Sequence, residues 1–195
     1  ALVPLGWSVA VEAEAGQMVG FGRTVLKDRI YEGWNAAVVF LGTNYGGSAT
    51  NYSRDLTAII DALAPRPTLL LTATLFKPVM QDVNAVIRTV ASKYPNVVVL
   101  DWGTAAAQPG LMNRDNVHPN DTGRQVLVGS IATALGNAPM GTGSCLPSKY
   151  TDDSLVTGDN TMPSSSIAGQ STVPGASTIA PQVTNAPLVT TTTTI

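Results

Sequence analysis

The sequence predicts a doubly wound α/β domain, in which helices cover both faces of a parallel sheet. Short apolar runs alternate along the chain with longer segments of helical periodicity. The short runs are apolar at consecutive positions, which is typical of strands buried on both faces. Hydrophobic residues make up 44% of the 195 residues, enough to build a packed core.

Four segments are predicted to be strands because they are short and rich in Val, Leu or Ala. In chain order they are residues 8–13, 36–41, 68–72 and 96–100. In parallel α/β sheets, ligands bind at the carboxyl ends of the strands. The loops that follow these four segments are therefore the first places to look for functional residues.

Four segments are predicted to be helices, namely residues 18–31, 52–63, 78–94 and 122–135. Gly20 and Gly22 lower the helical propensity of the first. Asn120 or Asp121 is suited to cap the last. Apolar residues recur at helical spacing in the second and third, and these faces should point to the core. They are Leu56, Ile59, Ile60 and Leu63, and Val79, Val83, Val86, Ile87 and Val90.

The composition changes near Asn137, which divides the chain into residues 1–137 and 138–195. The second part is rich in Ser, Thr and Pro and has few charges and hardly any aromatic residues. Such a segment buries too little apolar surface to offset the entropy lost on ordering. We therefore expect a low-complexity, disordered tail or surface stalk, with residues 149–154 as the part most able to dock on the domain.

Composition and charge exclude several classes of function. The net charge of −2 and the lack of any Lys- or Arg-rich run exclude a nucleic-acid surface. No apolar stretch approaches the roughly 20 residues of a membrane-spanning helix, and Ala1 does not open a signal peptide, so the start is processed or the sequence is a fragment. The lone Cys145 excludes an internal disulfide and a cysteine zinc site, and is either an unpaired thiol or the partner of an upstream cysteine.

The only histidine lies in a turn with a nearby acid. Asp115 precedes His118 by three positions, and Pro119 and a helix start follow. In such a turn the carboxylate can accept a hydrogen bond from Nδ1–H of the imidazole, which leaves Nε2 free to take a proton from an alcohol. The pattern predicts an acid and a general base.

A second polar residue follows the strand at 36–41. Asn44 stands in the sequence Gly42-Thr43-Asn44, where the glycine permits a tight turn. Its side-chain amide carries N–H donors that can be directed into a site at this edge of the sheet. This position suits a donor to an oxyanion.

Together, Gly42-Thr43-Asn44 and Asp115-Asn116-Val117-His118-Pro119 resemble the third and last sequence blocks of the SGNH (GDSL) hydrolase superfamily. The resemblance spans roughly residues 6–136. It implies a flavodoxin-like, three-layer domain in which Asp115 and His118 belong to a serine triad and Asn44 is an oxyanion-hole donor. The same resemblance makes Gly16 the candidate for the glycine of the second sequence block, which donates a backbone N–H to the oxyanion. It implies no metal and no organic cofactor.

The nucleophile of that superfamily is a serine in a Gly-Asp-Ser block after the first strand. Gly6-Trp7-Ser8 is the nearest match, but Trp7 replaces the aspartate and Ser8 begins a strand instead of ending one. We therefore expect the first strand and its serine to lie upstream of Ala1. A sheet without this strand would expose unpaired edges, which favours instability or aggregation.

The resemblance implies serine-type acyl transfer, by an esterase or an O-acyltransferase or deacetylase acting on carbohydrate or small esters. It is strongest to the SGNH domains that follow integral-membrane acyltransferases of bacterial envelopes. An extracytoplasmic location and an upstream membrane acyltransferase domain are therefore expected. The alternative is a non-catalytic relative that binds carbohydrate or has a structural role. A nucleotide- or flavin-binding module is disfavoured because no glycine-rich phosphate loop follows a strand.

Overall fold

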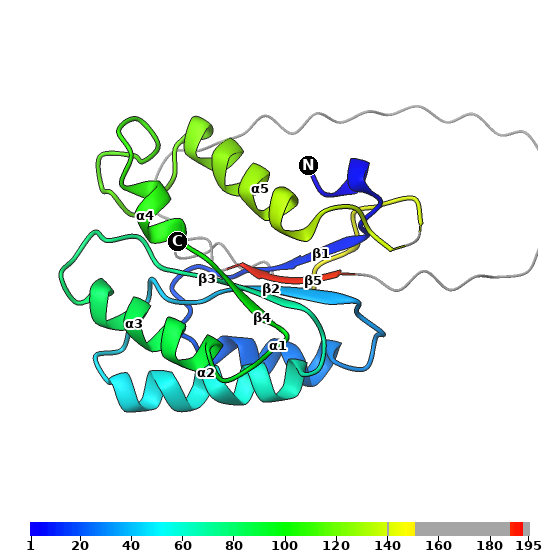
Figure 1. The fold of residues 1–195 in the computed structure, drawn as a ribbon, viewed down its shortest axis with the longest axis horizontal. Helices are drawn as coiled ribbons and strands as arrows, with labels where there is room; N and C mark the ends of the chain where they lie inside the picture. Colours follow the sequence, from blue (N-terminus) through cyan, green and yellow to red (C-terminus); the bar gives the residue numbers. More distant parts are fainter. Residues whose placement is uncertain (140, 151–187, 193–195) are drawn as a thin grey trace, which may run out of the picture.

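Five parallel strands form one sheet in the order β1-β5-β2-β3-β4 (Figure 1). The computed structural model describes residues 1–139, 141–150 and 188–192. The strands are β1 (Val9–Glu12), β2 (Ala36–Phe40), β3 (Thr68–Leu71), β4 (Val97–Leu100) and β5 (Leu188–Thr192). The predicted α/β class is confirmed.

Helices cover both faces of the sheet, as a doubly wound fold requires. One face carries α1 (Phe21–Arg29), α2 (Ala49–Leu63) and α3 (Met80–Ala91), and the other carries α4 (Trp102–Ala106) and α5 (Asp121–Leu135) (Figure 1). A 3-10 turn, η1 (Val3–Leu5), precedes β1. Successive residues of β2 alternate between the two cores: Val39 packs with α1 to α3, and Val38 packs with α4 and α5.

The expectation of strands buried on both faces holds for β2 and β3, whose residues are all buried. It is wrong for β4, because this strand lies at the edge of the sheet and leaves Val98 62% exposed. Val79 also differs from the expected core position: it precedes α3 and is 37% exposed. The short helix α4 was not predicted, since five residues are too few to show a helical period.

The expectation that residues 138–195 lack regular structure is wrong for Leu188–Thr192. These residues form β5, which pairs in parallel with β1 on one side and with β2 on the other. The physical reason combines a local and a distant cause: Val and Thr have high β propensity, and β1 and β2 offer backbone groups on both sides. Because β5 fills the place between β1 and β2, the expectation that these strand edges are left unpaired is wrong. Residues 151–187 lie outside the described part of the chain.

Residues beyond Asn137 also return to the domain, along the outer edge of β1. The amide of Val9 donates to the carbonyl of Ser144 (2.8 Å), and the amide of Ala13 donates to the carbonyl of Tyr150 (3.0 Å). The ring of Tyr150 packs edge-on against Phe21 at 5.5 Å. Part of the patch proposed at 149–154 therefore does dock, and it covers a strand edge that would otherwise be open.

The buried carboxylate of Glu12 anchors residues 147–150 to the domain. Glu12 is fully buried in β1, forms an ion pair with Arg29, and accepts hydrogen bonds from the amides of Lys149 and Tyr150 (both 2.8 Å). Arg29 also donates to the carbonyl of Pro147 (2.7 Å). The charge on Glu12 is thus compensated by a cation and by two backbone amides, as a buried carboxylate requires.

We expect Glu12→Ala to lower the free energy of unfolding by about 3 kcal/mol or more, because it removes the carboxylate that pairs with the buried side chain of Arg29 and accepts from the partly buried amides of Lys149 and Tyr150. The matched control is Glu32→Gln, which removes the half-exposed second partner of Arg29 and should cost less than about 1 kcal/mol. Urea unfolding measures both. Equal losses in the two variants would contradict the anchoring role of Glu12.

Candidate active site

The predicted contact between Asp115 and His118 is present. Nδ1 of His118 lies 2.6 Å from Oδ2 of Asp115, while Oδ1 accepts hydrogen bonds from the backbone amides of Val117 (2.8 Å) and His118 (3.0 Å). Both oxygens of the carboxylate are therefore engaged within one turn of chain. An ionised carboxylate at Nδ1 favours the tautomer with Nδ1 protonated, which makes Nε2 the basic nitrogen.

Backbone geometry closes this turn. The amide of Asn113 donates to the carbonyl of His118 (2.8 Å), and the amide of Asn116 donates to the carbonyl of Asn113 (3.0 Å). Asn116 has a φ of 56°, in the left-handed region that asparagine tolerates better than most residues with a side chain. The asparagine at this position therefore reverses the chain between the acid and the histidine.

The helix that follows holds the turn in place. Asn120 caps α5 by accepting a hydrogen bond from the amide of Gly123 (3.0 Å), as the sequence predicted, and it also donates to the carbonyl of Gly110 (2.9 Å). A β-carbon on Gly123 would overlap the carbonyl oxygen of Leu111. The missing side chain at 123 lets α5 approach the segment that leads into the turn.

Electrostatics keeps the acid ionised. Desolvation raises the pKa of Asp115, but the hydrogen bonds from the backbone and ring of His118 and from the amide of Val117 outweigh it and lower the pKa from 3.8 to about 2. The side chains of His118 and Asp115 remain 34% and 46% exposed. The pair is thus accessible to solvent, and the carboxylate of Asp115 is charged at physiological pH.

The two candidate oxyanion donors lie in the loops after β1 and β2, and a hydrogen bond joins these loops. The Nδ2 atom of Asn44 donates to the carbonyl of Gln17 at 3.1 Å, which joins the loop of Asn44 to the residue after Gly16. Gly16 has a φ of 73° and lies in an exposed turn, a conformation that suits glycine. The second N–H of the Asn44 amide has no hydrogen-bond acceptor among the described residues and can act as a donor.

Asn44 and the histidine turn (residues 113–118) line separate depressions. Asn44 borders one with Ser48 and Tyr52, whereas Asn116 borders another with Thr74. Within the described residues, no hydrogen bond joins Asn44 to Asp115 or His118. Their roles as oxyanion donor, acid and base remain predictions, as does that of Gly16.

Ser8 lies away from these loops, as expected. It directly precedes β1, so it stands at the amino end of a strand whose carboxyl end leads to Gly16. Its hydroxyl is 3.0 Å from the hydroxyl of Ser144. Ser48 is nearer to Asn44 in the chain, but its hydroxyl oxygen caps α2 by accepting from the amide of Asn51. Neither serine is presented to His118 by a described contact.

A polar network at the carboxyl ends of β3 and β4 was not predicted. Thr72, which follows β3, donates to Asp101 (2.9 Å) and accepts from the amide of Gly103 (2.8 Å). Asp101 also caps α4 through Thr104 and pairs with Arg88 at 2.7 Å. The sequence does contain one signal for it, because Asp101 three positions before Thr104 is a helix-capping spacing. The network fixes the carboxyl ends of β3 and β4 relative to each other.

In the described part of the chain, no three His, Cys, Asp or Glu side chains are placed together so that they could hold a metal ion. Among the same residues, no helix is both long and apolar enough to span a membrane.

The lowered pKa of Asp115 predicts a pH-dependent contribution to stability. Because the folded-state pKa of about 2 lies below the ordinary 3.8, the ionised carboxylate favours folding above that ordinary value, and this contribution is lost as the pH falls toward 2. We expect Asp115→Asn to be less stable than the parent near neutral pH. The difference in the free energy of unfolding should become smaller as the pH falls from 3.8 to about 2. Urea unfolding at a series of pH values tests this. A gap that is constant with pH would contradict it.

The conformation of Asn116 predicts different effects for two small replacements. Asn116→Ala should destabilise the protein by about 1 kcal/mol, because alanine is strained in the left-handed region, whereas Asn116→Gly adopts it freely. Thermal unfolding of the two variants gives the comparison, and the NMR signals of the His118 ring report whether the turn is kept. If alanine were tolerated as well as glycine, the proposed role of the backbone at 116 would be wrong.

No family model matches the sequence, and no curated protein matches it. Among solved structures, the fold is similar to that of a lipase/acylhydrolase from Enterococcus faecalis, with a TM-score of 0.55 and 19% sequence identity. The match covers 62% of this chain and 71% of that one. The chain therefore shares the α/β fold of an acylhydrolase, which is the fold that the resemblance to the SGNH hydrolases implied.

Proposed function

We propose that this chain forms most of a serine-type acyl-transfer domain in which His118 is the general base and Asp115 orients it. The observation that carries the proposal is the hydrogen bond of 2.6 Å between the two side chains, on a carboxylate whose other oxygen is held by two amides. A carboxylate held in this way fixes the orientation and the tautomer of the imidazole ring. The acylhydrolase fold supports the same reading.

In this proposal a serine from a segment upstream of Ala1 is the nucleophile. Nε2 of His118 takes the proton of the serine hydroxyl while the serine oxygen attacks the ester carbonyl. The Asn44 amide and the backbone N–H of Gly16 donate to the developing oxyanion. His118 then returns its proton to the leaving alcohol, and water or an acceptor hydroxyl releases the acyl group by the reverse sequence of proton transfers.

Hydrolysis and transfer differ only in what attacks the acyl-enzyme. Water gives an esterase or deacetylase, and the hydroxyl of a carbohydrate gives an O-acyltransferase. The sequence resemblance to domains behind bacterial envelope acyltransferases favours acylated carbohydrate as substrate and an extracytoplasmic location. It also favours a membrane acyltransferase domain as the upstream neighbour.

A non-catalytic role in binding carbohydrate is the second candidate. The observation behind it is that neither Ser8 nor Ser48 contacts His118 in the described part of the chain, since Ser8 pairs with Ser144 and Ser48 caps α2. If no serine reaches His118 in the natural protein, the fold would retain the loops of the site without the nucleophile. A Gly-Asp-Ser block after an upstream apolar strand would favour the catalytic candidate, and its absence would favour the binding role.

The catalytic proposal predicts a graded loss of ester hydrolysis in the longer natural protein, assayed with a small activated ester. His118→Ala should abolish the activity, and Asp115→Asn should lower turnover by about 10⁴-fold. Asn44→Ala should lower it by roughly 10²- to 10³-fold, the cost of one oxyanion donor. Residues 1–195 alone should hydrolyse the ester no faster than their own His118→Ala variant.

Ser8→Ala is the matched control, because it removes a serine hydroxyl from the other end of the sheet. It should leave the activity of the longer protein unchanged. Loss of a robust activity in Ser8→Ala would identify Ser8 as the nucleophile and overturn the upstream assignment. A longer protein that carries the Gly-Asp-Ser block and yet shows no His118-dependent activity would favour the binding role.

A further inference from the structure

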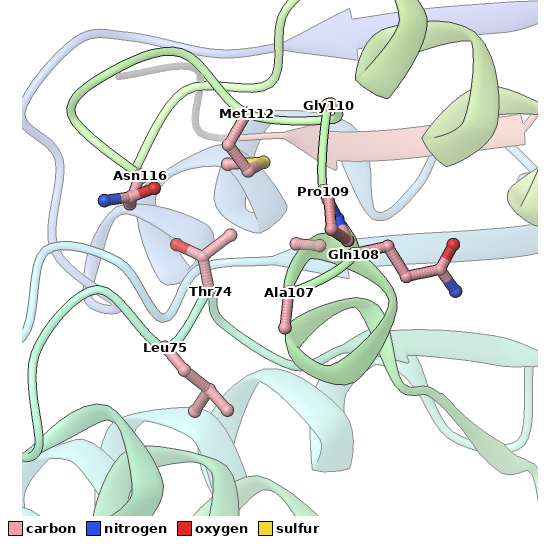
Figure 2. A pocket seen from close by; sticks show the side chains of 9 residues that line it. Thr74, Leu75, Ala107, Gln108, Pro109, Gly110, Met112 and Asn116 are labelled. Carbon is pink, nitrogen blue, oxygen red and sulfur yellow. The ribbon is translucent and has the colours of Figure 1, made fainter.

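A cavity of about 230 Å³ opens beside the histidine turn. Its walls come from the loop after β3 and from the segment that runs from the end of α4 toward Asp115 (Figure 2). Thr74 and Leu75 form one side, and Pro109, Met112 and Asn116 form the other. Asn116 directly follows Asp115 in the turn that carries His118, so the cavity borders that turn.

The cavity contains a buried hydroxyl that has no partner. Thr74 is only 2% exposed, and its Oγ1 forms no hydrogen bond to any described residue. Figure 2 shows its side chain directed into the space between Asn116 and Met112, with the oxygen on the side of Asn116. A buried hydroxyl without a partner costs about 1 to 3 kcal/mol, so such a group calls for an explanation.

The backbone beside Thr74 is held rigidly. Asn84, buried in α3, accepts a hydrogen bond from the amide of Ala73 (2.7 Å) and donates to its carbonyl (2.8 Å). Thr72, on the other side of Ala73, belongs to the network of Asp101 and Gly103. The hydroxyl of Thr74 is therefore presented to the cavity by a fixed loop, and this arrangement is preorganised for a ligand.

The chemistry of the walls limits what the cavity can hold. None of its nine lining residues carries an ionisable side chain, so an anionic or cationic group would lose hydration without gaining a countercharge. The volume also lies below the roughly 300 to 1,000 Å³ of sites for drug-sized ligands. A long acyl chain would not fit, whereas a compact neutral group would.

We propose that this cavity is a substrate subsite that binds a compact, uncharged group through a hydrogen-bonding oxygen on Thr74. Its assignment to substrate rests on the proposed acyl-transfer function, since the subsite is defined by its place beside the turn that carries Asp115 and His118. The oxygen has two possible sources, a hydroxyl on the alcohol side of the ester or a carbonyl on the acyl side. Both present the same chemistry to the threonine hydroxyl.

Binding to the full chain tests the subsite without any turnover. Methyl glucoside represents the alcohol source, N-methylbutyramide the acyl source, and butyrate is the anionic comparison. The backbone NMR signals of Thr74 and Asn116 report occupancy of the cavity. We expect at least one neutral compound to shift these signals in a saturable manner, and butyrate to bind at least tenfold more weakly than that compound.

Thr74→Val is the decisive variant, because it keeps the shape of the side chain and removes the hydroxyl. It should weaken the binding of the neutral compound by about fivefold to tenfold, the value of one hydrogen bond. The melting temperature should stay the same or rise, since the hydroxyl has no partner to lose. The same substitution at exposed Thr133 on α5 is the control, and it should not change binding.

Three results would overturn the proposal: no saturable binding of either neutral compound, equal binding by Thr74→Val and the parent, or equal binding of butyrate. These results are independent of catalysis. Binding that depends on Thr74, together with an inactive longer protein, would refute the proposed function and leave the cavity as a binding site for a neutral ligand. Esterase activity without such binding would leave the function intact and refute the subsite.

Discussion

The pairing of β5 with both of its neighbours is the constraint on which the sheet depends. β1 and β2 do not pair with each other; each pairs with β5, in parallel, through four and five residue positions respectively. The strand that joins them comes from the far end of the described chain. Without it, β1 and the group β2-β3-β4 would be separate pieces, each with an open edge of unpaired N–H and C=O groups.

This constraint reaches the candidate site through the loops that the strands carry. Gly16 follows β1 and Asn44 follows β2, so their separation is set by the width of the strand between them. The hydrogen bond from Asn44 to Gln17 then joins the two loops at the carboxyl edge of the sheet. On the other side of β2, the network around Thr72 and Asp101 joins the carboxyl ends of β3 and β4. Side-chain hydrogen bonds thus position loops whose strands are held by the backbone.

The features that could be predicted from the sequence are those determined over a few residues. The contact of Asp115 with His118 spans three positions, the Asn120 cap also spans three, and the buried face of α2 follows from its helical period. In each case the partners are brought together by the local backbone, so their spacing along the chain is sufficient evidence. The alternation of strands and helices is local in the same sense, and it predicted the α/β class.

The features that could not be predicted depend on distant partners. Glu12 is charged, which in a strand indicates a solvent-facing position, yet it is buried because Arg29 and the amides at 149 and 150 surround it. The composition of residues 138–195 describes their side chains, but the backbone of Leu188–Thr192 is what pairs with the sheet. The unpartnered hydroxyl of Thr74 gives no sequence signal, since threonine is common in strands and loops alike.

The order of the strands has a consequence for biosynthesis. A ribosome makes β1, β2, β3 and β4 long before it makes β5, so the nascent chain contains two groups of strands whose shared neighbour does not yet exist. During that interval the facing edges of β1 and β2 are free to pair with other extended chains. The sheet is complete only after residues 188–192 emerge. Contacts between residues so far apart in the sequence raise the contact order, and a high contact order is associated with a low folding rate.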